Sequence, residues 1–127
     1  MRISQEQYRQ FLNNSTKQNK YHNKKVVYDG IKFDSIKEKR AYTMYKLMEQ
    51  AGEIKDLERQ VEYLLIEPFT LNGKKYRKTS YVCDFTYKDK EDKLHVIDVK
   101  SEATKTQVYK LKKKLMAWKY GIEIDEI

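Results

Sequence analysis

The chain has 127 residues, which is the length of one domain and too short for two. Lysine and arginine outnumber aspartate and glutamate by 27 to 19, and the formal charge of +8 favours a polyanionic partner, nucleic acid first of all, although an acidic protein or a membrane surface would also suit it. The single cysteine, Cys83, excludes an intrachain disulfide, and with only two histidines the chain lacks the ligands of a structural zinc site, so any metal ion should be held by oxygen atoms.

The first 24 residues are expected to form an arm outside the domain of residues 25–127. Ser4 can cap a short helix that reaches Leu12, and the polar residues 13–20 have little apolar surface to bury, which is typical of a linker. Residues 26–33 predict a β-hairpin, because the Asp-Gly pair at its centre tolerates the positive φ angles of a tight turn.

A helix and a strand follow the hairpin. Ser35 is placed to cap a helix that ends near Ala51, where Gly52 can adopt the left-handed conformation of a C-terminal cap. Residues 54–66 are rich in β-forming side chains and predict one long or bent strand that ends before Pro68.

Two further strands are predicted to pair as a hairpin. The Asn-Gly turn at 72–73 leads into a strand over 76–87, and the polar residues 89–92 separate it from a strand over 94–100.

The last part of the chain predicts one helix and one strand. Apolar residues recur at the three- and four-residue spacing of an amphipathic helix over 104–120, which Gly121 ends. These residues are Val108, Leu111, Leu115 and Trp118. Strict alternation predicts a final strand over 122–127. The core order is therefore helix, three strands, helix and strand, an α/β fold.

The strands carry the residues best suited to chemistry. Side chains two apart on a strand share a face, so Asp98 and Lys100 should point the same way, about 6.6 Å apart along the strand. If residues 88 and 94 close the hairpin, Asp84 lies opposite Asp98 with Cβ atoms about 5 Å apart. Like charges in that position destabilise a sheet, so we expect a cation between them, and Mg²⁺ fits because it takes few protein ligands.

Glu38 admits two interpretations. With Ser35 it satisfies the capping-box pattern, in which the glutamate bonds back to the cap residue. It also shares a helical face with Ala41, Tyr42 and Tyr45, which would turn its carboxylate toward the core and within reach of a metal ion on the sheet. The residues alone leave both open.

Other polar residues are candidates for binding. Gln60 is either an accessory site residue or, more commonly for such a position, a surface residue of an edge strand. The basic clusters are either solvated faces or contacts to DNA phosphates, and Tyr109 beside them would add a stacking or packing contact. These clusters are Lys74, Lys75, Arg77 and Lys78, and Lys110, Lys113 and Lys114. His95 alternates away from Asp98, and Cys83 points opposite to Asp84 as a core thiol.

The ordered set of Glu38 on a helix, Asp84 on a strand, Asp98-Val99-Lys100 on the next strand and then a basic helix resembles the PD-(D/E)xK nuclease superfamily. Residues 26–127 are also similar to a family of small phage nucleases and to Holliday-junction resolvases. The motifs that carry this likeness are Gly30-Ile31-Lys32-Phe33-Asp34-Ser35, Ala51-Gly52-Glu53-Ile54, Tyr81-Val82-Cys83-Asp84-Phe85 and Ile122-Glu123-Ile124. Cys83 stands where the superfamily motif has its proline, and Gln60 matches a polar position only loosely.

The resemblance implies a restriction-endonuclease-like fold, with a central mixed sheet flanked by helices in the order α-β-β-β-α-β. It implies DNA cleavage with Mg²⁺ or Mn²⁺, Asp84 and Asp98 as metal ligands, Glu38 as a further acid and Lys100 as the catalytic lysine. We expect a structure-selective enzyme of phage DNA replication or recombination, acting on branched or duplex DNA in the host cytoplasm and favoured as a homodimer by junction symmetry. A sequence-specific or non-specific nuclease and a non-catalytic DNA-binding adaptor are the alternatives. Neither a membrane nor a small-molecule cofactor is expected.

Overall fold

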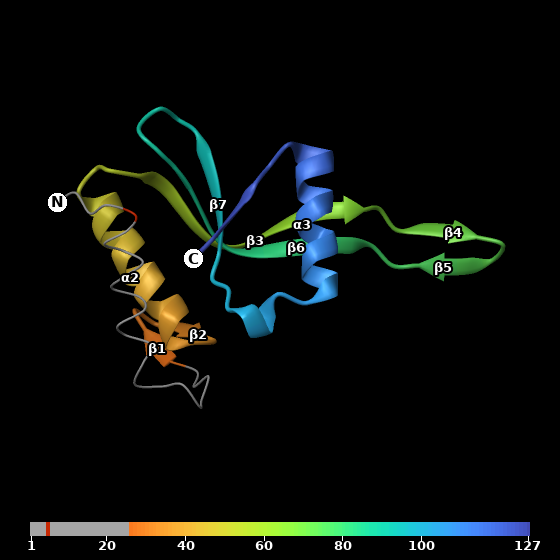
Figure 1. Cartoon of the computed structure of the whole chain (residues 1–127), viewed down its shortest axis with the longest axis horizontal. Helices are drawn as coiled ribbons and strands as arrows, with labels where there is room; N and C mark the ends of the chain where they lie inside the picture. Colours follow the sequence, from red (N-terminus) through yellow and green to blue (C-terminus); the bar gives the residue numbers. More distant parts are fainter. Residues whose placement is uncertain (1–4, 6–25) are drawn as a thin grey trace. The chain divides into compact units, whose positions relative to one another are not determined.

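The computed structural model describes Gln5 and residues 26–127 (Figure 1). These residues fall into two compact units. In the described range, one unit runs to Leu57 and includes residues 87–94 and Ile127, and the other comprises residues 58–86 and 95–126. The predicted N-terminal helix and linker lie outside the described residues.

The first unit contains a hairpin and a helix, both as predicted. Strands β1 (Val26–Tyr28) and β2 (Ile31–Phe33) pair antiparallel, with Tyr28 opposite Ile31, across an Asp29-Gly30 turn whose φ angles are 55° and 72°. Helix α2 (Ile36–Gln50) begins at Ser35, whose Oγ accepts a hydrogen bond of 3.0 Å from the Glu38 N–H.

The same helix packs on the hairpin through aromatic rings. The ring of Tyr42 lies 5.2 Å from that of buried Phe33, and its hydroxyl donates to Asp29 at 3.1 Å. Gly52, with a φ of 76°, follows the C-cap residue Ala51 in the left-handed conformation predicted for it.

A four-stranded mixed sheet has the order β3-β6-β7-β8. Its strands are β3 (Lys55–Ile66), β6 (Thr79–Lys88), β7 (Leu94–Asp98) and β8 (Ile124–Glu126). Strands β7 and β8 run parallel, with Val96 opposite Ile124. The protein therefore has the predicted α/β architecture with a mixed sheet, and α2, β3, β6, β7, α3 and β8 follow one another along the chain in the predicted order.

The strand predicted over 76–87 begins later than expected. Strands β4 (Phe69–Leu71) and β5 (Lys74–Tyr76) form a separate hairpin around Asn72 and Gly73, and β6 starts only at Thr79. The rings of Phe69 and Tyr76 stack 4.7 Å apart across this small ladder. Tyr76 therefore belongs to the hairpin β4-β5 and not to the central sheet.

The next two elements also differ at one end from their predicted bounds. Strand β7 ends at Asp98 and not at Lys100, because the Val99 N–H donates to the Asp84 carboxylate at 2.8 Å. A 3-10 turn, η2 (Glu102–Thr104), then precedes helix α3 (Gln107–Tyr120), which Thr106 caps. The helix starts later than the predicted residue 104, because the Thr104 hydroxyl is hydrogen-bonded to Ser101 within the turn.

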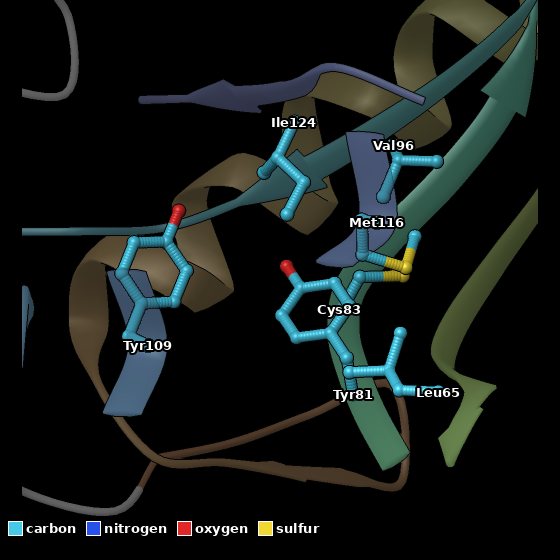
Figure 2. Packing of buried hydrophobic residues seen from close by; sticks show 7 residues of the cluster. All are labelled: Leu65, Tyr81, Cys83, Val96, Tyr109, Met116 and Ile124. Atoms are coloured by element: carbon cyan, nitrogen blue, oxygen red, sulfur yellow. The ribbon is translucent and has the colours of Figure 1, made fainter. Parts of the chain in front are cut away.

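The second unit has one core between α3 and the sheet (Figure 2). Tyr109 and Met116, two turns apart on α3, pack against Tyr81, Cys83 and other buried residues. The rest of this core is Leu65, Val96 and Ile124. The helix is thus amphipathic as predicted, but the recurring residues Val108, Leu111 and Trp118 lie on its exposed side.

Within the described residues, neither helix is long and apolar enough to cross a lipid bilayer.

Candidate active site

Asp98 is the most deeply buried acid of the second unit. It is the last residue of β7 and only 3% exposed. The hydroxyl of Tyr81, on β6, donates to its Oδ2 at 2.6 Å. Burial raises the pKa of Tyr81 well above its ordinary value, and the hydrogen bond to Asp98 raises it further. Tyr81 therefore stays protonated and acts as a permanent donor to this carboxylate.

Lys100 reaches the same carboxylate, as predicted from its spacing. Its Nζ lies 3.5 Å from Asp98 Oδ2, although the strand itself has ended. The ammonium group also stands over the ring of Tyr109, 4.2 Å from the ring centre. Lys100 is thus held between a carboxylate and an aromatic face. The predicted accessory role of Tyr109 in binding DNA stays a prediction.

Asp84 completes the group through the backbone. Its Oδ2 accepts the hydrogen bond from Val99, the residue between Asp98 and Lys100. The Asp89 N–H donates to the Lys93 carbonyl at 3.0 Å, so residues 89 and 93 pair across the hairpin. This is the same register as the predicted pairing of residues 88 and 94. The structure therefore brings Asp84 to the Asp98-Val99-Lys100 segment.

The phenol of Tyr109 lies near both acids. Burial raises the pKa of Tyr109, a hydrogen bond to Glu126 raises it further, and the charges of Asp98 and Asp84 add to the shift. The phenol therefore lies within reach of the charge of both carboxylates.

Glu126 is a neighbour of the site that the sequence analysis missed. It lies on β8 directly opposite Asp98, and its Oε2 accepts a hydrogen bond of 2.6 Å from Tyr109. Its Oε1 lies 3.3 Å from Lys113 and 3.7 Å from Lys105. Burial favours a higher pKa for Glu126, but the bonds from Tyr109 and Lys113 and the charges of both lysines hold it below its ordinary value.

A signal for Glu126 is present in the alternating tail. Ile122, Ile124 and Glu126 are each two residues apart, so the glutamate occupies a position on the apolar side of the strand. Tyr81 was also missed. In the sequence it is an ordinary strand tyrosine, and no local pattern indicates its hydrogen bond to Asp98, 17 residues away.

For Glu38 and Gln60 the structure gives the local surroundings, and their predicted roles stay predictions. Glu38 is buried on α2 and faces inward with Ala41, Tyr42 and Tyr45, as expected, and its N–H makes the capping bond to Ser35. It belongs to the first unit, whereas Asp84 and Asp98 belong to the second. Gln60 is exposed on the edge strand β3 with a φ of 53°, which favours its interpretation as a surface residue.

The predicted basic residues lie on two surfaces. Lys110, Lys113 and Lys114 line one cavity of about 510 Å³ together with residues 121–124, which confirms that they share a side of α3. The second cluster, Lys74 to Lys78, is exposed on and after β5, and Lys78 forms an ion pair of 3.2 Å with Glu62.

Neither Cys83 nor His95 is part of the acid–lysine group. Cys83 is completely buried, and burial raises the pKa of its thiol to about 12. His95 is partly buried, with its Nδ1 3.5 Å from Asp125.

A divalent ion such as Mg²⁺ requires oxygen ligands, which carboxylates supply. Across residues 26–127, no three or more acid, histidine or cysteine side chains converge on one point. Asp84 and Asp98 nevertheless offer carboxylate oxygens, and Mg²⁺ commonly takes one or two carboxylates, with water and substrate phosphate as the remaining ligands. The Oδ1 of Asp98 accepts no hydrogen bond within the described part of the chain. The pair of aspartates therefore fits such an ion.

Comparison with known proteins gives one match. Neither the curated proteins nor the solved structures include a match to the chain. The family model described as "Protein of unknown function (DUF1064)" matches residues 18–125, which is most of the sequence. The chain therefore belongs to the DUF1064 family.

Proposed function

We propose that this protein is a metal-dependent DNA endonuclease with a restriction-endonuclease-like, PD-(D/E)xK fold. The observation that carries the proposal is the cluster at the end of β7. Asp98 is buried with the ammonium group of Lys100 3.5 Å from its carboxylate, and the Asp84 carboxylate is fixed to the peptide group between them. Two carboxylates and one lysine that come together at the end of a strand are suited to phosphodiester hydrolysis.

Asp84 and Asp98 would hold the Mg²⁺ or Mn²⁺ ion, and the role of Glu38 as a further acid stays an expectation from the resemblance alone. A bound ion of this kind lowers the pKa of a water molecule and stabilises the negative charge that develops on a phosphate. In hydrolysis, the attacking water loses one proton and its oxygen forms a bond to phosphorus, while the ester P–O bond breaks and the leaving oxygen takes up a proton.

The residues of the chain have separate roles in that reaction. Lys100 donates hydrogen bonds to a phosphate oxygen and screens its growing charge. Tyr81 holds Asp98 Oδ2 in place, which leaves Oδ1 to bind. Tyr109 positions Lys100 through its ring and is itself fixed by its bond to Glu126.

DNA is the substrate that the charge favours. The net charge of +8 attracts a polyanion, and the lysine-lined cavity of α3 lies beside Glu126, one strand from Asp98. We propose selectivity for branched DNA, such as a four-way junction, cut by a homodimer. A non-catalytic DNA-binding adaptor is the second candidate, since no three-ligand acidic cluster is found within the described residues.

The test incubates purified full-length protein with four labelled DNAs: a four-way junction, a flap, a linear duplex and a single strand. Each is assayed with Mg²⁺ and with a chelator. Cleavage should require the metal ion and should be fastest on the junction. Tight binding with no cleavage of any substrate would contradict the nuclease and support the DNA-binding adaptor. Equal cleavage of all four DNAs would contradict the preference for branched DNA.

Variants locate the chemistry. Asp98→Asn and Lys100→Ala should abolish cleavage while DNA binding survives. Asp92→Asn is the matched control, because Asp92 lies in the β6–β7 turn, where it pairs with Lys55, and has a positive φ that asparagine tolerates. A double variant of Asp98 and Lys100 that still cuts DNA would show that the cluster is only a salt-bridged strand end.

A further inference from the structure

Helix α3 carries a row of four large apolar side chains, three of which are exposed. Val108, Leu111 and Trp118 are 62%, 56% and 78% exposed, and Leu115 between them is only partly buried at the edge of the core. The four are spaced by three, four and three residues, so they form one continuous stripe along the helix. An apolar stripe of this kind on a soluble protein marks an interaction surface.

The spacing is that of a coiled-coil seam. Val108 and Leu115 occupy the a positions of two heptads, and Leu111 and Trp118 occupy the d positions. The 14 residues of α3 span these two heptads, a length of about 21 Å. The helix therefore carries half of a short knobs-into-holes interface.

The flanking positions of this seam are all basic or neutral. Lys112 and Lys119 fall at e positions and Lys114 falls at a g position, with Gln107 at the other g. Helix α3 has five lysines and no acidic residue. In a coiled coil the charged side chains at e and g select the partner. Lys119 donates to the Leu65 carbonyl at 3.2 Å, so Lys112 and Lys114 are the lysines placed to select glutamate or aspartate opposite them.

We propose that this stripe docks an amphipathic helix of a different protein, with apolar residues at its a and d positions and acidic residues at e and g. A second copy of α3 would place lysine against lysine along both edges. The segment of residues 1–25 fits no better, because it contains six lysine and arginine residues and one glutamate. DNA would pair with the lysines, but it would leave the indole and the aliphatic side chains uncovered.

The docking surface is separate from the acid–lysine cluster. Another side of α3 carries Tyr109, whose ring lies under Lys100, and Met116, which is buried in the core. A helix bound to the stripe would therefore leave these contacts in place. The inference does not rest on nuclease activity, and binding can be measured without metal ion or DNA.

Trp118 is the only tryptophan of the chain, so its fluorescence reports directly on the stripe. The probe is a synthetic three-heptad peptide without tryptophan, with leucine at a and d and glutamate at e and g. The control peptide is identical except for lysine at e and g. The acidic peptide should shift Trp118 emission to shorter wavelength and bind more weakly as salt is raised, and the lysine peptide should do neither.

A charge-reversed protein provides the second arm. The variant with both Lys112→Glu and Lys114→Glu should lose at least about tenfold in affinity for the acidic peptide and should now bind the lysine peptide. Circular dichroism verifies that this variant is folded.

Four results would overturn the proposal. They are no emission change with the acidic peptide, an equal response to both peptides, a shift with anionic phospholipid vesicles but not with peptide, and a shift that the protein alone undergoes as its concentration rises. The third result would assign the stripe to a membrane surface and the fourth to a second copy of the chain.

Discussion

Removing the Tyr81 hydroxyl should lower the free energy of unfolding by more than the loss of an ordinary surface hydrogen bond would. Tyr81→Phe keeps the ring in the core but withdraws the 2.6 Å hydrogen bond from a carboxylate that is 3% exposed. A hydrogen bond to a charged group contributes about 1.5–3 kcal/mol. Because Asp98 is shielded from water, little solvent can replace the lost donor. We therefore expect the free energy of unfolding to fall by about 1.5–3 kcal/mol, which for a chain of this length lowers the melting temperature by about 5–10 °C.

Urea unfolding followed by circular dichroism measures this loss. Tyr120→Phe is the matched control, since its hydroxyl donates to the neutral carbonyl of Leu64 at the surface and should contribute about 1 kcal/mol or less. In an Asp98→Asn background the effect of Tyr81→Phe should shrink, because the acceptor is no longer charged. Equal losses for the two tyrosines, or additive effects of Tyr81→Phe and Asp98→Asn, would refute the reasoning.

Three further predictions concern single side chains. The pKa of Glu126 is lowered in the folded protein, so the charged carboxylate stabilises the fold above its ordinary pKa of 4.5, and this stabilisation disappears as the pH falls through the folded pKa. In urea unfolding at several pH values, Glu126→Gln should therefore lose less stability than the wild type between about pH 5 and about pH 3. Cys83, with a thiol pKa near 12, should react with a thiol reagent at pH 8 only as fast as the protein unfolds, and rapid labelling of native protein would contradict its burial. Lys110→Ala should reduce the slope of log affinity for DNA against log salt concentration by about 0.9, whereas Lys112→Ala, on the same helix but outside the cavity, should leave it nearly unchanged; equal slopes for both variants would argue against the cavity as a phosphate contact.

Local patterns predicted much of the fold and the centre of the site. The Asp29-Gly30 turn, the Ser35 cap and the shared side of Asp98 and Lys100 each depend on residues close in sequence, where backbone geometry leaves few choices. These features are confirmed because nothing distant needs to be known to place them.

Features that depend on distant parts of the chain could not be read in the same way. The alignment of Glu126 with Asp98 depends on how α3 returns the chain to the sheet, and no spacing encodes that register. The buried face of α3 is a similar case. Both the Tyr109–Met116 pair and the stripe with Trp118 suit a helix, and only the packing of the sheet decides which one is covered.

The positive φ angle at Gln60 bears on how the protein behaves when it is concentrated. Strand β3 forms one edge of the sheet within the described residues, and an extended edge offers unpaired peptide groups to strands of other molecules. Gln60 and Asp56 both leave the extended conformation, and exposed charges at Lys55, Glu58 and Glu62 line the same strand. An edge that is interrupted and charged is a poor template for edge-to-edge growth. We therefore expect β3 to resist amyloid-like aggregation, and Gln60 to contribute to solubility through its backbone more than through its side chain.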